Sequence, residues 1–267
     1  MWQDPVRGAE HPDVIDSIPI GREDLLEVGV AVSHLQLLNR QRQTTQGESR
    51  ITNHESRVII RRLGLAPYEQ TWEAMKSFTS ARTSATHDEI WLLEHPPIYT
   101  YGVAGRSEHL PDAGCAIPVL KVDRGGQVTY HGPGQLVAYV LLDLQRRALT
   151  VRGLIRTLEQ AVIDLLTDFD ISAARRESAP GVYIGEAKVA ALGIRIRHGC
   201  CYHGLSLNVD MDLAPFCAID PCGYAGLEVT QLRDLGVRMP IEGVGDRLAV
   251  KLTRQLEVAM RPMQTTA

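Results

Sequence analysis

Two residues, Cys222 and Lys188, pair a potential nucleophile with a potential activator. A cysteine attacks a carbonyl carbon as the thiolate, and a nearby ammonium group lowers the pKa of a thiol toward neutrality. Cys222 lies between Pro221 and Gly223, which favours a constrained turn that presents the thiol rather than buries it. Lys188 begins an apolar stretch with small neighbours, where partial burial would strengthen its charge. These residue types indicate acyl transfer through a covalent intermediate.

A glycine-rich stretch upstream of Lys188 adds the features of a binding segment. It reads Arg124-Gly125-Gly126-Gln127-Val128-Thr129-Tyr130-His131-Gly132-Pro133-Gly134-Gln135. Its glycines let the backbone turn tightly and let a ligand approach the N–H groups. It has neither the Lys-Ser/Thr ending of a phosphate-binding P-loop nor the glycine spacing of a dinucleotide loop. We interpret it as part of a pocket, with a plain hairpin turn as the alternative.

The cysteine pattern argues against a metal site. The five cysteines are Cys115, Cys200, Cys201, Cys217 and Cys222. Two are adjacent and no CxxC pair occurs, so we expect no zinc and no other metal. We expect Cys115, Cys200 and Cys201 to be buried small hydrophobic residues. Cys217, five positions before Cys222, is the rival nucleophile, and the two could form a disulfide only under oxidation.

Apolar periodicity predicts the elements that must position these residues. Helical spacing predicts helices from Tyr68 to about Ser80, over residues 151–166, and from a start near Asp246. Alternating and β-branched runs predict strands. The predicted strands are Val58–Ile60, Ile90–Leu93, Val119–Val122, Val128–Tyr130, Gln135–Leu144, Gly181–Ile184, Lys188–Arg197 and Tyr202–Val209. The last three form an antiparallel meander, and the whole indicates an α+β fold with a mixed β-sheet and packed helices.

Composition limits the class of protein. The chain has 267 residues, a formal charge of −4 and 5% aromatic residues, so we expect no nucleic-acid partner. Apolar runs are too short to span a bilayer and no signal peptide is evident, which predicts a cytoplasmic protein with no membrane partner. Residues 1–56 are predicted to be a largely disordered N-terminal extension, because polar residues dominate much of this segment. Residues 57–267 form one predicted domain.

Six short segments together resemble one known family. They occur in the family's order over roughly residues 57–235, and the glycine-histidine run is highly specific. The segments are Arg61-Arg62-Leu63-Gly64, His95-Pro96-Pro97, Arg124 to Gln135, Lys188-Val189-Ala190-Ala191-Leu192-Gly193, His203-Gly204-Leu205 and Pro221-Cys222-Gly223. The sequence therefore resembles the lipoyl(octanoyl) transferases, the LipB-type octanoyl-acyl-carrier-protein:protein N-octanoyltransferases.

The resemblance implies a fold shared with biotin and lipoate protein ligases, and a two-step reaction in domain 57–267 without a cofactor. Cys222 would take the octanoyl group from octanoyl-acyl carrier protein as a thioester, while Lys188 lowers its pKa. A lysine of a 2-oxo-acid dehydrogenase lipoyl domain, or of the glycine-cleavage H protein, would then accept the group as an amide. The implied substrate-binding residues are Arg124, Gly125, Gly126, Gln127, Val128, Thr129, Tyr130, His131, Ala191, Leu192, Gly193, Gly204, Leu205 and Ser206.

Three other functions remain open at this point. An ATP-dependent lipoate protein ligase of the same fold would not need a Pro-Cys-Gly nucleophile. A non-catalytic binder of lipoyl domains or acyl carriers would need neither Cys222 nor Lys188. A cysteine hydrolase would release the free acid to water, although no separate Cys-His-Asn signature supports it.

Overall fold

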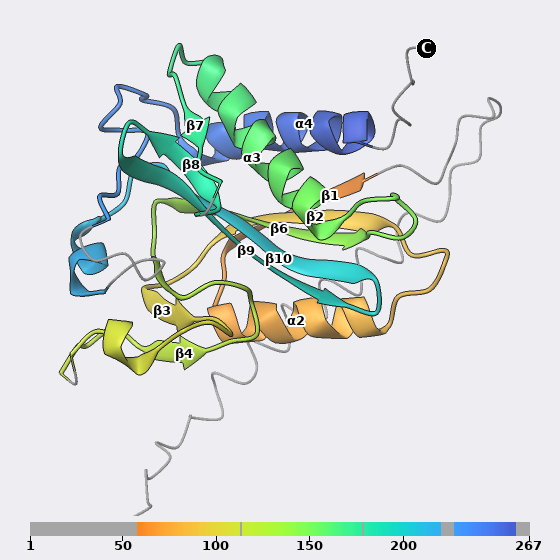
Figure 1. Cartoon of the computed structure of the whole chain (residues 1–267), viewed down its shortest axis with the longest axis horizontal. Helices are drawn as coiled ribbons and strands as arrows, with labels where there is room; N and C mark the ends of the chain where they lie inside the picture. Colours follow the sequence, from red (N-terminus) through yellow and green to blue (C-terminus); the bar gives the residue numbers. More distant parts are fainter. Residues whose placement is uncertain (1–57, 113, 178, 220–226, 260–267) are drawn as a thin grey trace, which may run out of the picture. The chain divides into compact units, whose positions relative to one another are not determined.

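The computed structural model describes residues 58–259, except 113, 178 and 220–226. Its main sheet has seven strands in the order β1-β2-β6-β10-β9-β8-β7. They are β1 (Val58–Leu65), β2 (Asp88–Glu94), β6 (Gln135–Asp143), β7 (Ala174–Arg175), β8 (Gly181–Ile184), β9 (Ala187–Arg197) and β10 (Cys200–Asn208). β1 and β2 are parallel and the other neighbours are antiparallel, so the sheet is mixed (Figure 1).

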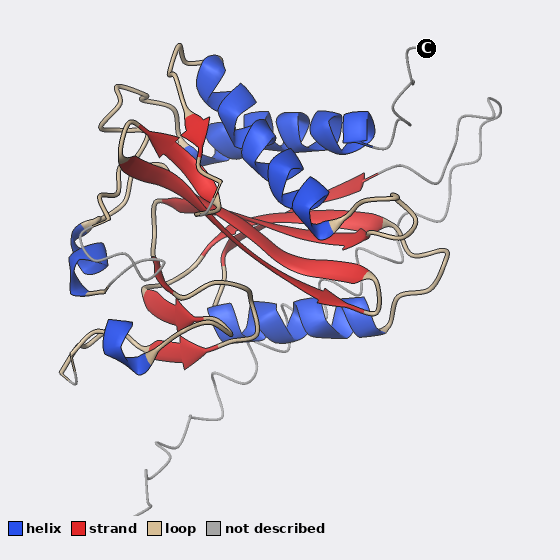
Figure 2. Cartoon of the chain, viewed as in Figure 1, coloured by secondary structure: helices blue, strands red, loops and turns tan. Residues whose placement is uncertain are grey.

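Helices cover both faces of this sheet (Figure 2). α3 (Val151–Thr167) and α4 (Ile241–Ala259) pack together on one face, and α2 (Tyr68–Ser80) lies on the other. β6 shows why both faces need cover, because its alternate side chains enter two different cores. Leu136 and Val140 join the core that holds the α3 and α4 leucines, whereas Tyr139 joins the core that holds Met75 of α2.

Helix α3 begins where its sequence supplies a local signal. The hydroxyl of Thr150 caps α3 by accepting the Gly153 N–H at 3.0 Å, which satisfies one of the free amides of the first turn. The predicted leucine stripe of α3 is buried, with Leu154, Leu158 and Leu165 fully covered. Amphipathic spacing and capping therefore agree on this helix.

A smaller sheet of three strands has the order β4-β3-β5. These are β3 (Ile98–Tyr101), β4 (Val119–Lys121) and β5 (Val128–His131), with short 3-10 turns at η2 (Ser107–His109) and η3 (Ala214–Ala218). β4 and β5 each pair with β3 and not with each other, so the glycine-rich loop between them does not close a two-stranded hairpin. β3 escaped prediction because it is four residues long and directly follows a pair of prolines, too little for an alternating pattern.

The predicted α+β class and mixed sheet are confirmed, and so is the antiparallel meander β8-β9-β10. The predicted start of the last helix near Asp246 is wrong. α4 begins at Ile241, where the Pro240 carbonyl accepts the Val244 N–H at 3.1 Å. Asp246 instead lies within the helix and accepts a bond from Arg62 Nε at 2.9 Å.

Two further predictions concern the N-terminal segment and the absence of a membrane-spanning segment. The predicted extension 1–56 lies outside the described residues, so its boundary with the domain stays a prediction. Among the helices that the structure describes, none is long and apolar enough to cross a membrane.

Candidate active site

The glycine loop between β4 and β5 lies directly on strand β9. The Gly125 N–H donates to the Ile194 carbonyl at 3.0 Å. A Cβ added at Gly193 would lie 2.8 Å from the Gly125 carbonyl oxygen, and one at Gly125 would lie 3.1 Å from that of Ile194. The two predicted glycine segments therefore meet because neither carries a side chain at the contact.

This contact forms one side of a hollow that we call the glycine-lined pocket. Its lining residues are Tyr68, Arg124, Gly126, Gln127, Val128, Thr129, His131, Tyr139, Ala191, Leu192, Gly193, His203, Gly204, Leu205 and Ser206. Three segments far apart in sequence, predicted separately to bind substrate, thus converge on one place. Pockets with a few convergent polar groups are where ligands bind most often.

Two of the predicted binding residues do not line the pocket. Gly125 is the contact with β9 described above. The Tyr130 ring packs against Tyr99 and Phe216, with centroid separations of 5.4 and 5.6 Å, in the core beneath the small sheet. The binding roles of Gly125 and Tyr130 stay predictions. In the structure, both residues make packing contacts outside the lining of the pocket.

Arg124 holds the glycine loop in shape. Its side chain is buried, and its Nη2 donates to the carbonyls of Thr100 at 2.6 Å and Gln127 at 2.7 Å. Nη1 donates to the Gly125 carbonyl at 3.0 Å. A guanidinium suits this position because its planar fork of donors can satisfy several loop carbonyls at once.

Sequence reasoning omitted three lining residues: Tyr68, Tyr139 and His203. His203 carried a usable signal, since it precedes Gly204 in the Tyr-His-Gly segment. The two tyrosines carried none, because each sits in an apolar pattern that already explains it as core. The Tyr139 hydroxyl donates to His95 Nε2 at 2.7 Å, because His95 Nδ1 donates to the Ala66 carbonyl, so the aromatic wall is hydrogen-bonded as well as packed.

Buried histidines surround the pocket. Burial lowers the pKa of His95 to about 4, opposed by its bond with the Ala66 carbonyl. Burial also lowers the pKa of His131 well below its ordinary value, and lowers that of His203 despite the opposing pull of Asp123. All three imidazoles are therefore neutral near pH 7, because a buried ring loses the hydration that its cation needs.

Asp123 is the charged group behind this wall. Burial disfavours its carboxylate, but bonds from His203, Tyr202 and Trp72 outweigh burial and lower its pKa. Trp72 Nε1 donates to Oδ1 at 2.8 Å, His203 Nε2 lies 3.0 Å from the same oxygen, and Tyr202 donates to Oδ2. Three donors from α2 and β10 thus fix one anion beside the pocket.

Lys188 is buried near the beginning of β9, with 4% of its surface exposed. Its Nζ donates to the Pro180 carbonyl at 3.3 Å and lies 5.1 Å from the Tyr183 ring centroid. A Cβ on Gly181 would lie 2.9 Å from Lys188 Cε, so a glycine there makes room for the side chain. A lysine that begins a strand is usually solvated, whereas Lys188 is buried.

The main chain of Lys188 also fixes the segment that follows the undescribed residues. Its N–H donates to the Glu228 carbonyl at 2.8 Å, and its carbonyl accepts the Thr230 N–H at 3.0 Å. Residues 228–230 therefore lie along Lys188 in a short parallel bridge. Cys222 lies outside the described residues.

The other cysteines divide between core and surface. Cys200 and Cys201 are buried as predicted. The prediction that Cys115 is buried is wrong, because the thiol lies exposed in the loop between η2 and β4. The cause is local: Cys115 belongs to no helix or strand that could turn it inward. Cys217 is exposed on η3.

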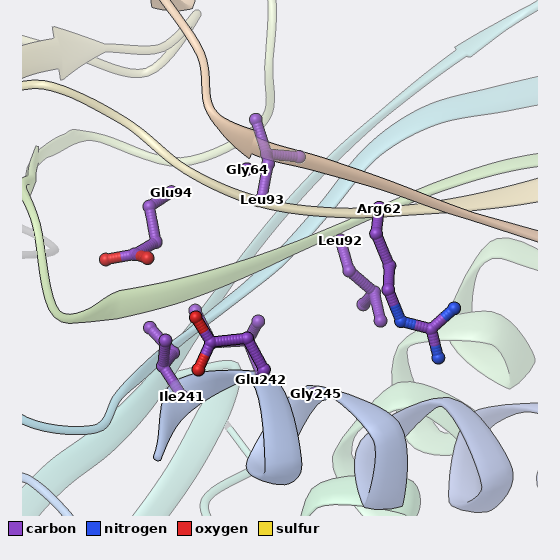
Figure 3. A pocket seen from close by; sticks show the side chains of 9 residues that line it. Arg62, Gly64, Leu92, Leu93, Glu94, Ile241, Glu242 and Gly245 are labelled. Atoms are coloured by element: carbon purple, nitrogen blue, oxygen red, sulfur yellow. The ribbon is translucent and has the colours of Figure 1, made fainter.

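A second hollow, of about 100 Å³, lies between β2 and the start of α4 (Figure 3). We call it the α4 hollow, and its lining residues are Arg62, Gly64, Leu92, Leu93, Glu94, Leu136, Ile241, Glu242 and Gly245. None of the predicted site residues lines it. One charged residue of the hollow already has a structural partner. Glu94 Oε2 accepts the Gly134 N–H at 2.6 Å and so helps to hold the loop that contains Gly134.

The fold is that of the lipoate protein ligases. A lipoate-protein ligase A bound with ATP matches with a TM-score of 0.61 over 76% of this chain and 86% of that chain, at 18% identity. A bi-partite lipoate protein ligase from Thermoplasma acidophilum matches with the same score over 76% and 84%, also at 18% identity. The predicted fold class is confirmed.

Sequence comparison narrows this class. Residues 67–253 match the lipoyl protein ligase A/B catalytic domain. An octanoyltransferase of Dechloromonas aromatica (strain RCB) is 58% identical over 200 residues, covering 74% of this chain and 97% of its own. One from Azoarcus sp. (strain BH72) is 57% identical over 205 residues, covering 77% and 90%. The chain belongs to the LipB-type octanoyltransferase family: it is an acyltransferase that transfers octanoyl groups in protein lipoylation.

Proposed function

We propose that this enzyme takes the octanoyl group from octanoyl-acyl carrier protein onto Cys222 and passes it to a lysine of lipoyl domains or of the glycine-cleavage H protein. The observation that carries the proposal is the buried Lys188, tied by its main chain to residues 228–230. Cys222 precedes Glu228 by six residues (228 − 222 = 6), a length of chain that reaches at most about 20 Å.

A buried ammonium suits the role of activator. Its charge acts through protein rather than water, so its attraction for a nearby thiolate is less screened than at the surface. The protonated amine also has no lone pair, and so Lys188 does not compete with the acceptor lysine for the acyl group. The cation stabilises the thiolate and thereby lowers the pKa of the thiol.

The first step exchanges one thioester for another. The Cys222 thiolate attacks the thioester carbonyl, a tetrahedral oxyanion forms, and the carrier thiolate leaves with the electron pair of the broken C–S bond. The glycine segments lining the pocket can supply N–H groups to the oxyanion, each worth about 3–4 kcal/mol in related sites. Exchange between thioesters is nearly balanced in energy, and no ATP is needed.

The second step converts the thioester into an amide. The acceptor amine attacks the acyl carbon, the C–N bond forms, the Cys222 sulfur leaves with the electron pair of the broken C–S bond, and the proton lost by the nitrogen balances the charge of that thiolate. Amide formation from a thioester is favourable, which drives the transfer. Apolar lining residues such as Val128, Leu192 and Leu205 suit an alkyl chain, at about 0.8 kcal/mol for each buried CH₂ group.

Intact-mass measurement of the acyl adduct tests this proposal. After incubation with octanoyl-acyl carrier protein and without ATP, the wild-type enzyme should gain one octanoyl group. Cys222→Ser should gain none, whereas the control Cys217→Ser should behave as wild type, because Cys217 is an exposed residue of η3. An adduct that persists in Cys222→Ser, or that depends on Cys217 or on ATP, would refute the assignment.

The role of Lys188 has its own measurement. In Lys188→Ala, alkylation of Cys222 should follow a titration shifted to higher pH, because the cation that favours the thiolate is gone. Lys188→Arg is the matched variant, since it keeps the charge. Identical alkylation profiles in the wild-type and alanine proteins would show that Lys188 is not the activator.

A further inference from the structure

A hollow of about 900 Å³ lies between the first half of α3 and the edge strand β7. We call it the arginine groove, because its lining includes Arg152, Arg156, Arg175 and Arg176. Among the described residues that line it, the acidic ones are Glu159 and Glu177, which leaves a formal charge of +2 (4 − 2 = 2). The whole chain carries −4, so the groove concentrates charge of the opposite sign.

The two arginines on the β7 side are held in place. Arg175 Nε lies 3.4 Å from Glu159 Oε2, and its Nη2 donates to Gln160 Oε1 at 2.6 Å. Arg176 Nη2 donates to Glu186 Oε2 at 2.7 Å. This wall of the groove therefore consists of fixed guanidinium groups whose nearest carboxylates already balance part of their charge.

The two arginines on the α3 side have no such balance. Arg152 and Arg156 are exposed, lie one helical turn apart, and form no ion pair with any described residue. Two like charges at this spacing repel each other. Arg152 also lies in the first turn of α3, which contains no acidic residue, although the helix dipole favours negative charge there. An acidic partner in the groove would relieve both effects.

Apolar side chains accompany these charges on α3. Val151 and Ile155 also line the groove one turn apart, and Val151 is 46% exposed. A small anion would satisfy the arginines but leave these side chains in water. The combination suits the surface of a protein that carries acidic residues beside apolar ones, since such interfaces bury apolar side chains within a polar rim.

One peptide unit separates the groove from the buried Lys188. The Pro180 carbonyl accepts a bond from Lys188 Nζ at 3.3 Å, and the Gly181 N–H of the same peptide unit donates to Glu159 Oε1 at 3.0 Å. Pro180 and Glu159 both line the groove. A protein that docks there is therefore held next to the buried amine.

The position of the groove decides between the two protein partners of the reaction. The groove is lined by α3, whereas the glycine-lined pocket is lined by Tyr68 of α2, and these helices cover opposite faces of the sheet (Figure 1). An acceptor brings its amine on a lysine side chain of four methylene groups, so its body must lie at the pocket. An acyl carrier protein holds its thioester at the end of a long flexible arm, which can pass around the sheet edge.

We propose that the arginine groove docks an acidic face of the acyl carrier protein that donates the octanoyl group. Arg152 and Arg156 meet its carboxylates, and Val151 and Ile155 are covered by its apolar side chains. This inference rests on the donor named under the proposed function, and it assigns the acceptor domain to a different surface.

Direct binding of the carrier protein tests the proposal. With the unacylated carrier as the probe, no reaction occurs and the Kd is measured by titration calorimetry at low salt. Arg156→Glu should raise the Kd about tenfold or more, because the new charge repels an acidic face. Arg254→Glu is the matched control, since Arg254 is exposed on α4 and does not line the groove, and its Kd should stay within twofold of wild type.

Arg152→Glu separates docking from folding. Glutamate in the first turn of α3 interacts favourably with the helix dipole, so this variant should unfold at the wild-type temperature or above it. It should nevertheless bind the carrier about tenfold more weakly. Binding to the wild-type enzyme should weaken as salt is added, because contacts between exposed charges are screened.

Two donors separate docking from chemistry. With octanoyl-acyl carrier protein, Arg156→Glu should acquire its octanoyl group about tenfold more slowly than wild type at low donor concentration. With octanoyl-pantetheine, a thioester without a protein, the rates of Arg156→Glu and wild type should agree within twofold. Transfer from the isolated octanoyl-enzyme to a lipoyl domain should also be unchanged.

Three results would overturn the inference: carrier binding by Arg152→Glu and Arg156→Glu within twofold of wild type, an equal loss in Arg254→Glu, or a loss confined to transfer to the lipoyl domain. An octanoyl adduct on Cys217 in place of Cys222, with carrier binding still dependent on Arg156, would refute only the proposed nucleophile. A wild-type enzyme that takes octanoyl groups from another donor and binds no carrier protein would refute both proposals.

Discussion

The glycine-lined pocket and the α4 hollow lie in the same domain and differ in what lines them. The pocket holds about 50 Å³ and the hollow about 100 Å³. The pocket has buried imidazoles, a fixed carboxylate and main-chain amides around it. The hollow is lined by four aliphatic residues, three charged residues and two glycines, with no imidazole. Buried imidazoles and glycine segments that converge on one place make the pocket the better candidate site.

One glycine in each cavity makes the contrast specific. A Cβ on Gly204 in the pocket would lie 2.0 Å from the Ala138 carbonyl oxygen, a separation that no side chain can occupy. A Cβ on Gly245 in the hollow would lie 3.5 Å from Leu136 and 3.6 Å from Leu92, which is ordinary contact. The pocket therefore has no room for a side chain at position 204, whereas the hollow has room for a methyl group at position 245.

Gly204→Ala should have the largest effect. The added methyl group meets main-chain atoms of β6 that cannot move without breaking the sheet, so we expect a loss of about 3 kcal/mol or more of unfolding free energy. Urea denaturation measures this directly. A Gly204→Ala protein as stable as wild type would show that the pocket wall is more adaptable than its geometry implies.

The buried histidines of the pocket should make stability depend on pH. His95 has a folded pKa of about 4 and an ordinary value of 6.5, so the unfolded chain takes up a proton first as the pH falls. The free energy of unfolding should therefore decrease between pH 6.5 and 4 by about 3 kcal/mol from this group, and no further below. In His95→Gln that part of the slope should disappear, and an unchanged slope would contradict the assignment.

Gly193→Ala should separate activity from stability. Its methyl group would press on the Gly125 carbonyl at 2.8 Å and on Arg124, so the glycine loop must shift away from β9. We expect a loss of about 1–2 kcal/mol in stability but a larger proportional loss in octanoyl transfer, measured with the folded protein. Equal activity per folded molecule would mean that the loop position does not matter for the reaction.

Gly245→Ala should have the smallest effect, and of opposite sign. Alanine favours a helix over glycine by about 1 kcal/mol, and here its methyl group would also contact Leu136 and Leu92. Thermal unfolding should show a modest stabilisation while octanoyl transfer stays at the wild-type rate. A clear drop in activity would assign the α4 hollow a functional part and erase the contrast with the pocket.

Predictions from sequence succeeded where the signal was local and repeated. The leucine stripe predicted α3 and the alternation in residues 188–197 predicted β9, because each pattern spans several turns or alternations. β3 was missed, since four residues after two prolines carry no period. The start of α4 was misplaced because Asp246 resembles a cap, while the proline that precedes the true start gave the better signal.

For the site, the sequence alone determined the residue types and, through the motif resemblance, the reaction family. Glycines at 125, 193 and 204 could be identified as backbone positions near a ligand without knowing what they contact. Only the tertiary structure decided that these glycines lie against one another or line one pocket, and that Tyr68, Tyr139 and His203 complete it. The contact between Gly125 and Gly193 joins residues 68 positions apart (193 − 125 = 68), and no local pattern records it. The pairing of His203 with Asp123 is of the same kind, because Asp123 comes from another part of the chain.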